Sequence, residues 1–197
     1  NNAGRISTVS QKADNISLKV SNMSRVLTVI SRQLDNSAAA SYVGTESQRM
    51  ISSANRGFTY FFYLGDNTQV IHDTYGTPSE CDTMAQELNG KRGAPGVLVI
   101  LSYDATSMSQ KLLDELEWWG LDPSMIGTWN SARIAFAFIG ESNLGRGRGW
   151  WAKASGASGV ATTQARISNG HVVPQYDGGD TAQKNVLLAT GIDIESH

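Results

Sequence analysis

The sequence predicts an α/β fold, a mixed β-sheet flanked by helices, preceded by an N-terminal trimeric coiled-coil stalk. Three observations lead to this prediction. Apolar residues near the N-terminus recur with alternating spacings of three and four. Further along, apolar strand-like runs alternate with segments that have helical spacing and helix caps. The chain of 197 residues is also long enough for one ordinary domain with an appendage.

The expected stalk covers residues 1–41 and is defined by nine apolar positions. Their unbroken alternation of three and four is the 3.5-residue repeat of a coiled coil, and β-branched residues at its d positions favour three strands or more. Two alternatives stay open, a helix packed on its own head and a strand over 16–20, where polarity alternates with period two. The nine positions are Ile6, Val9, Ala13, Ile16, Val20, Met23, Leu27, Ile30 and Leu34.

The expected α/β head covers residues 58–176 and follows a linker with a short helix over 42–57. Strands are predicted over 58–64, 69–75, 96–103 and 134–140, and helices over 80–88 and about 109–119. Asn169-Gly170 is a strong hairpin signal between 160–167 and 171–173. Residues 177–197 are expected to be a C-terminal tail that could dock on a neighbouring subunit.

Composition excludes several classes of partner. With 16 Lys and Arg against 18 Asp and Glu, the net charge is −2, which predicts no nucleic-acid partner. No apolar run reaches the roughly 18 residues of a membrane span, so no membrane insertion is expected. The single cysteine, Cys81, cannot form a disulfide within the chain and is expected to be a small buried thiol. The chain begins without Met or a leader, so we expect a piece of a longer protein.

Catalytic signatures are missing from the sequence. It contains no P-loop, no nucleophile elbow and no metal-ligand spacing among its three histidines and one cysteine. We therefore expect no enzyme, no cofactor and no metal. The carboxylate pair to test against this expectation is Asp104 with Glu141, because both are expected at the C-terminal ends of strands, where α/β sites form.

The candidate ligand-binding residues lie mainly in a glycine-rich segment, 145–159. Two adjacent tryptophans there cannot easily both enter one core, so one is expected to be exposed or at a subunit contact. Exposed tryptophan stacks on sugar rings, and arginine binds carboxylates and phosphates. The alternative is that the tryptophan pair anchors the loop to the sheet or to a neighbouring subunit. The candidate set is Trp129, Arg146, Arg148, Trp150 and Trp151.

Residues 58 to about 173 resemble the interleukin-like EMT inducer domain. The resemblance is carried by the strand 97–100 leading into Tyr103-Asp104-Ala105, by Leu112, Leu116 and Gly120, and by the approach 129–133 to the strand 136–140. It implies a non-catalytic fold, with carbohydrate binding in at least one branch of the family. Glu141-Ser142 stand where the family has Lys-Gly, and the disulfides of vertebrate members cannot form with one cysteine.

The expected stalk is similar to segments of phage tail-tip and central-fibre proteins, through repeats of the type Ile16-Ser17-Leu18-Lys19-Val20. This similarity implies a homotrimeric tail-fibre tip on the virion. Such a tip would bind a bacterial surface polysaccharide or an outer-membrane protein without catalysis. Two alternatives stay open, a structural fibre joint and a glycan-degrading tailspike-like enzyme.

Overall fold

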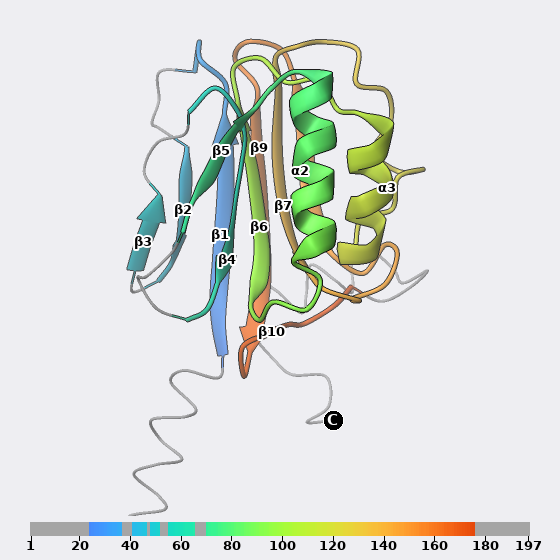
Figure 1. The fold of residues 1–197 in the computed structure, drawn as a ribbon. Helices are drawn as coiled ribbons and strands as arrows, with labels where there is room; N and C mark the ends of the chain where they lie inside the picture. Colours follow the sequence, from blue (N-terminus) through green and yellow to red (C-terminus); the bar gives the residue numbers. More distant parts are fainter. Residues whose placement is uncertain (1–23, 37–40, 47, 52–54, 66–69, 176–197) are drawn as a thin grey trace, which may run out of the picture.

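The computed structural model describes residues 24–36, 41–46, 48–51, 55–65 and 70–175. These residues form three layers, two five-stranded β-sheets packed face to face and a pair of helices on the outer face of one sheet (Figure 1). Sheet A has the strand order β10-β9-β1-β2-β3, and sheet B has the order β5-β4-β6-β7-β8. Every strand pair in both sheets is antiparallel.

The elements have the following bounds. Sheet A contains β1 (Ser24–Arg32), β2 (Tyr42–Thr45), β3 (Gln48–Ile51), β9 (Val160–Ser168) and β10 (His171–Val172). Sheet B contains β4 (Gly57–Tyr63), β5 (His72–Tyr75), β6 (Val97–Tyr103), β7 (Ile134–Glu141) and β8 (Trp150–Ser155). The helices are α2 (Pro78–Gly90) and α3 (Gln110–Trp119).

Strand β1 is the central strand of sheet A. It pairs with β9 over its whole length, from Ser24 opposite Ser168 to Arg32 opposite Val160. The β-branched run within β1 suits a strand, and its burial alternates with period two. Leu27 and Val29 are fully buried against sheet B. This strand is therefore part of the globular core.

The predicted fold class is wrong in two respects. The described fold is β-rich, with two antiparallel sheets and two short helices, and it is not a mixed α/β sheet. The predicted coiled-coil stalk also fails where the structure describes it, because Leu27 and Ile30 lie in β1 and Leu34 lies in the turn after it. The six seam positions up to Met23, and the tail 177–197, lie outside the described residues.

The segment predicted as a linker with a short helix is also different. Residues 42–51 contribute β2 and β3, which extend sheet A beyond β1. The heptad spacing was misleading for a geometric reason. Inward residues of a strand are two positions apart, but when some outward residues are also apolar, apolar residues taken from both faces can lie three or four positions apart. Ile30 is the apolar outward residue that lies three positions after the inward Leu27 and creates this ambiguity in β1.

Most elements of the predicted head are confirmed. Strands β4, β5, β6 and β7 and the hairpin β9–β10 lie where the sequence placed them. Helix α2 begins with a capping box in which Thr77, not the predicted Ser79, is the N-cap, and it runs through Gly90. Ser109 caps α3, which stops at Gly120, as predicted. Residues 150–155, predicted as loop, form the edge strand β8.

Sheet B is buried on both faces, so its strands contribute to two apolar cores. One core fills the space between the sheets, and the other lies between sheet B and the helices. A buried polar link joins the sheets, because the Ser31 hydroxyl of β1 donates to the Ser102 carbonyl of β6. The Ser102 hydroxyl in turn donates to the Ile134 carbonyl at 2.7 Å. The inter-sheet contact is therefore fixed by both packing and hydrogen bonds.

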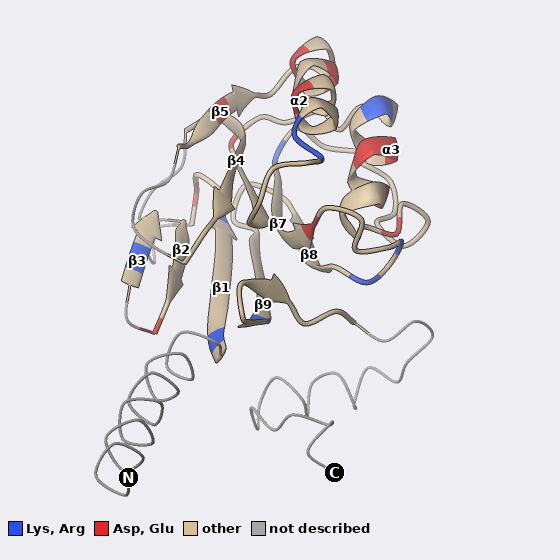
Figure 2. Cartoon of the chain, turned by 60° about the horizontal axis from the view of Figure 1, so that its bottom comes forward, with Lys and Arg blue, Asp and Glu red and all other residues tan. Residues whose placement is uncertain are grey.

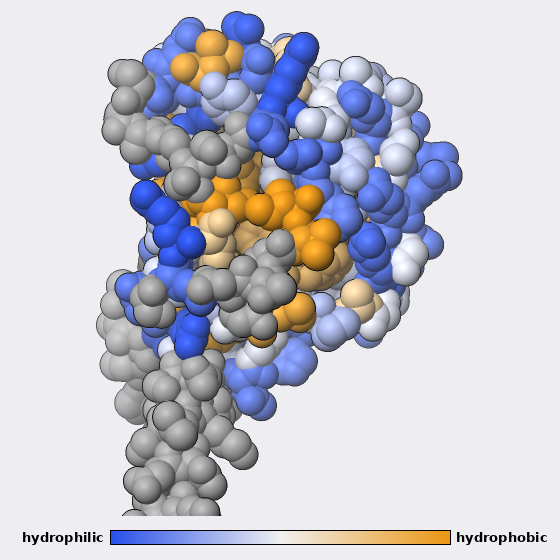
Figure 3. Space-filling view, turned by 60° about the vertical axis from the view of Figure 1, so that its left-hand side comes forward, coloured by the Kyte–Doolittle hydropathy of each residue, from blue (hydrophilic) through white to orange (hydrophobic). Residues whose placement is uncertain are grey.

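The short edge strands β3 and β5 lie on one side of the molecule (Figure 1). An apolar area is visible on that side in Figure 3. Val70 and Ile71, just before β5, are exposed, as is Leu64 just after β4. Each of these edge strands has four residues, a length that limits pairing with another chain.

Candidate functional site

The register of sheet B divides the predicted site residues between its two ends. Val97, the first residue of β6, pairs with Glu141, whereas Asp104 follows Val97 by seven residues. At about 3.4 Å per residue, the two carboxylates are therefore roughly 20 Å apart. Paired glycosidase carboxylates lie about 5–10 Å apart. The two carboxylates that the sequence singled out for testing are therefore not brought together, because the strands are antiparallel and their C-terminal ends do not share an edge.

The adjacent tryptophans lie on opposite faces of β8. Trp150 is only 7% exposed and points into the core between the sheets, where its Nε1 donates to the Val173 carbonyl at 2.8 Å. Trp151 is half-buried against the helix-side core. The alternation of a strand lets both rings pack, one in each core. Trp150 therefore anchors the segment 145–159 in the core between the sheets, which is one of the alternatives that the sequence left open.

The two candidate arginines lie in the connection between β7 and β8. Arg146 is 52% exposed, and its guanidinium bonds Asp122 at 3.0 Å and approaches Glu117 at 3.8 Å. Hydrogen bonds from Ser124, with help from the Arg146 guanidinium, hold the pKa of Asp122 below its usual value. Arg148 Nε donates to the Gln175 carbonyl at 3.4 Å. Both arginines are thus engaged by neighbouring parts of the chain.

Trp129 lies at the opposite end of sheet B, in the approach to β7. Its ring packs against Phe58 and Phe136, with centroid distances of 5.7 and 5.8 Å. Its Nε1 donates to the Thr106 carbonyl at 3.2 Å, and the Lys153 ammonium lies 5.7 Å from its centroid. Partial burial lowers the pKa of Lys153. The ring keeps a half-buried position at the surface, so part of it is open to a ligand.

Asp104 lies at this same end, between two arginines. Its carboxylate accepts from Arg133 Nε at 3.1 Å and lies 3.9 Å from Arg56 Nε. Beside it is a cavity of about 380 Å³ that combines charged, hydroxyl and backbone groups. Its lining includes Arg56, Thr74, Gly76, Thr77, Pro78, Glu80, Ala105 and Ser107. We call Arg56, Thr74, Asp104, Trp129 and Arg133 the Asp104 surface.

The backbone at the Asp104 surface is held in uncommon conformations. Asp104 has φ 54° and Thr74 has φ 75°, in the left-handed region that a β-branched residue rarely adopts. Gly76 lies against the segment that follows β6, so close that a Cβ on Gly76 would be 2.8 Å from the Ala105 carbonyl oxygen. Such strain persists only where surrounding contacts enforce it, and it concentrates at functional sites. The sequence showed Asp104 and Trp129 as candidates but gave no signal for Thr74, Arg56 or Arg133.

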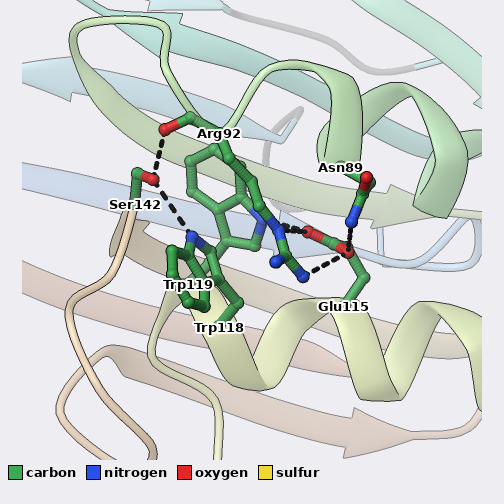
Figure 4. Close-up of polar contacts among 6 residues, drawn as sticks. All are labelled: Asn89, Arg92, Glu115, Trp118, Trp119 and Ser142. Atoms are coloured by element: carbon green, nitrogen blue, oxygen red, sulfur yellow. Dashed lines mark hydrogen bonds and ion pairs between the residues drawn. The ribbon is translucent and has the colours of Figure 1, made fainter.

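A second polar cluster joins the two helices (Figure 4). Glu115 of α3 is 7% exposed and forms a forked ion pair with Arg92, at 2.9 and 2.8 Å. Asn89 and the Trp119 Nε1 also donate to this carboxylate. The Arg92 guanidinium covers the ring of Trp118 at 4.4 Å. Both oxygens of Glu115 are satisfied within the protein, so we interpret this cluster as a structural joint.

Another carboxylate, Glu87 of α2, accepts hydrogen bonds from Tyr60 and Tyr75, each at 3.0 Å. Burial and these contacts with Glu87 raise the pKa of both phenols, that of Tyr75 to about 12. His72 stacks on Tyr60 with a centroid distance of 4.6 Å. Neutral phenols that donate to a carboxylate fasten β4 and β5 to α2. This arrangement also stabilises the sheet–helix contact.

Cys81 in α2 is fully buried, as the sequence predicted. Burial raises the pKa of its thiol to about 11. Because the thiolate is the reactive form, we expect the native protein not to react with a thiol reagent such as Ellman's reagent at pH 8. One equivalent should react after denaturation in guanidinium chloride. Rapid labelling of the native protein would contradict this burial.

Lys and Arg lie in separate patches over the described surface and do not form a continuous basic stripe (Figure 2). Within the described ranges, no three His, Cys, Asp or Glu side chains gather closely enough to hold a metal ion. Neither of the two described helices, α2 and α3, is long and apolar enough to cross a membrane.

Comparisons with known proteins do not assign this chain to a class, so its description rests on the fold and the site. No protein-family model matches the chain, and no curated protein matches it. The fold and the site define a β-rich module of two antiparallel sheets with a strained, charged surface at one end.

Proposed function

We propose that this chain is a non-enzymatic recognition module of a phage tail-fibre tip and that its Asp104 surface binds a bacterial surface polysaccharide. The observation that carries the proposal is the pairing of Asp104 with Arg133 beside a cavity, on backbone held in strained conformations. The resemblance to the interleukin-like EMT inducer domain, with carbohydrate binding in one branch, supports the same class of ligand.

The chemistry of the Asp104 surface suits a sugar. A carboxylate accepts hydrogen bonds from sugar hydroxyls, and a guanidinium donates to ring oxygens or to the acidic groups of bacterial glycans. The partly open ring of Trp129 offers an apolar plane for the C–H face of a sugar. Because Asp104 and Arg133 already hold each other in place, a ligand would meet side chains that need little reordering.

The site is small, which is why we favour a polysaccharide over an outer-membrane protein. A cavity of about 380 Å³ lies at the lower end of the roughly 300–1,000 Å³ typical of small-ligand pockets. Binding through one such site is expected to be weak. A homotrimeric fibre, which stays a prediction, would raise the avidity by presenting several copies on one particle.

The proposal is tested with an array of bacterial polysaccharides and lipopolysaccharides, probed with the whole chain. For a glycan that binds, Arg133→Gln should weaken binding about tenfold, which corresponds to the loss of about 1.4 kcal/mol from a charge-assisted contact. Arg146→Gln is a matched control, because both arginines pair with an aspartate and are about half exposed, 48% and 52%. It should leave binding unchanged.

The opposite pattern of effects would place the glycan-binding site elsewhere on the protein. If Arg146→Gln weakens binding and Arg133→Gln does not, the segment 145–159 carries the ligand, as the sequence first predicted. Release of reducing ends from the bound polysaccharide would instead identify an enzyme. Binding of no glycan on the array, together with binding to purified outer-membrane protein, would overturn the choice of ligand.

A further inference from the structure

The two arginines of the Asp104 surface approach Asp104 through Nε alone. Arg133 Nε donates to the carboxylate at 3.1 Å, and Arg56 Nε lies 3.9 Å from its other oxygen. The Nη groups of both guanidiniums have no partner among the described residues. By contrast, Arg92 and Arg146 each place an Nη group against a carboxylate as well, at 2.8 and 3.0 Å. The Asp104 surface therefore presents two guanidinium ends that the fold itself does not use.

Both guanidinium ends can be reached from solvent. The side chain of Arg56 is 74% exposed and that of Arg133 is 48% exposed. Arg56 lines the cavity of about 380 Å³, and Arg133 is bridged across the sheet to Ala105, another residue of the cavity lining. In the free protein water occupies the Nη groups, and a ligand at the mouth of the cavity can replace that water without moving the backbone.

The carboxylates near the cavity already have donors from the protein. Glu80 accepts from the Thr77 backbone N–H at 2.9 Å, as part of the capping box of α2. Asp73, which precedes the lining residue Thr74, accepts from the Asn55 amide. The strongest groups left for a ligand are therefore the N–H donors of the two arginines. The chemical complement of such donors is an anionic oxygen.

A carboxylate fits the free end of a guanidinium because its two oxygens can accept from the two Nη groups in parallel. Since Asp104 is bonded to Arg133 Nε, this end of the guanidinium stays open to a second carboxylate. Two arginines and one aspartate also leave one surplus positive charge, which one carboxylate would neutralise. A uronic acid carries one carboxylate on a sugar ring whose C–H face can stack on the partly open ring of Trp129.

We propose that the Asp104 surface selects acidic polysaccharides and that Arg56 and Arg133 together bind the carboxylate of a uronic acid. This inference rests on the proposed function, because it names the class of glycan that the same site binds. It assigns to Arg56, a residue that the glycan test above leaves unchanged, the preference for an acidic over a neutral sugar.

The test compares alginate and hyaluronan, which contain uronic acids, with the same polysaccharides after chemical reduction of their carboxylates to alcohols. The binding of each to the whole chain is measured by biolayer interferometry. At least one acidic form should bind about tenfold more tightly than its reduced form, or better. Raising the salt from about 0.05 M to about 0.5 M should remove most of this difference, because salt screens exposed charges.

Arg56→Gln removes one of the two cations and should bring the affinities of the acidic and reduced forms to within about threefold of each other. It should leave the affinity for the reduced form and the melting temperature unchanged, since the side chain is largely exposed. Arg146→Gln is the matched control, because it removes the same charge from a guanidinium whose Nη group is bonded to Asp122. It should preserve the preference for the acidic form.

The outcomes separate this inference from the proposed function. Equal affinity for the acidic and reduced forms, with both weakened by Arg133→Gln, would overturn the inference and leave the proposed function standing. Binding that Arg133→Gln does not weaken, or no binding to any glycan, would overturn both. Tighter binding of a teichoic acid, whose charge lies on phosphodiesters, than of either uronate would overturn the choice of a carboxylate. A preference for the acid that survives Arg56→Gln would overturn the role of Arg56.

Discussion

A chain that begins at residue 37 is expected not to fold. This truncation removes β1, the strand that joins β9 to β2 in sheet A, and with it the fully buried Leu27 and Val29. Sheet A would be divided into two hairpins, and the inner face of sheet B would be exposed to water. Circular dichroism in the near ultraviolet and dispersion of the amide NMR spectrum should both show loss of fixed tertiary structure.

A chain that begins at residue 21 is the control, because it retains every described strand. If the stalk ended at residue 41, as the sequence predicted, both truncations would leave the head folded.

A pair of substitutions in β1 gives the same test without truncation. Val29→Asp places an unpaired charge between the sheets and should destabilise the fold by about 4 kcal/mol or more, whereas Thr28→Asp, one residue away on the outer face, should cost little.

Loss of the ion pair between Arg92, just after α2, and Glu115 of α3 is expected to have the second-largest effect. Arg92→Ala leaves the buried carboxylate of Glu115 without its cation. Breaking a buried pair by removing one partner costs about 3–5 kcal/mol, and we expect about 3 kcal/mol because a third of the Arg92 side chain is exposed. Urea denaturation followed by tryptophan fluorescence would measure the change in the free energy of unfolding.

The neighbouring Lys91→Ala serves as the control for this substitution and should change stability by less than about 0.5 kcal/mol. A second background separates the lost charge from lost packing. In a Glu115→Gln protein, the glutamine oxygen can still accept from Trp119 while the negative charge is gone. Arg92→Ala should then cost much less than it does beside Glu115. Equal costs in the two backgrounds would mean that Arg92 stabilises the fold through its contact with Trp118 alone.

The sequence located β4, β5, β6, β7 and both helices because their signals are local, but it took β8 for a loop. Continuous apolar runs identified β6 and β7, Ser109 identified the start of α3, and Asn169-Gly170 identified the last hairpin. The rest of sheet A was missed because the evidence for it is not local. β1 pairs with β9 more than 120 positions along the chain, and only that pairing shows which of its apolar residues face inward. Its spacing of three and four therefore suggested a helix.

The candidate sites were predicted only in part for a related reason. Residue type indicated Asp104, Trp129 and Glu141 as chemically interesting, but the antiparallel strands place Glu141 at the opposite end of sheet B from Asp104 and Trp129. The aspartate's partner, Arg133, is recognisable only once Ala105 and Arg133 are bridged across the sheet.

The pairing of β1 with β9 also has a consequence for how the protein reaches its native state. One side of β1 must stay unpaired until β9, which begins at Val160, has left the ribosome, so sheet A cannot close before that point of synthesis. Chains dominated by such distant pairings fold slowly, on the order of milliseconds to seconds. During that interval the row of open backbone groups along β1 is exposed to neighbouring nascent chains, and this strand is where misassembly would begin.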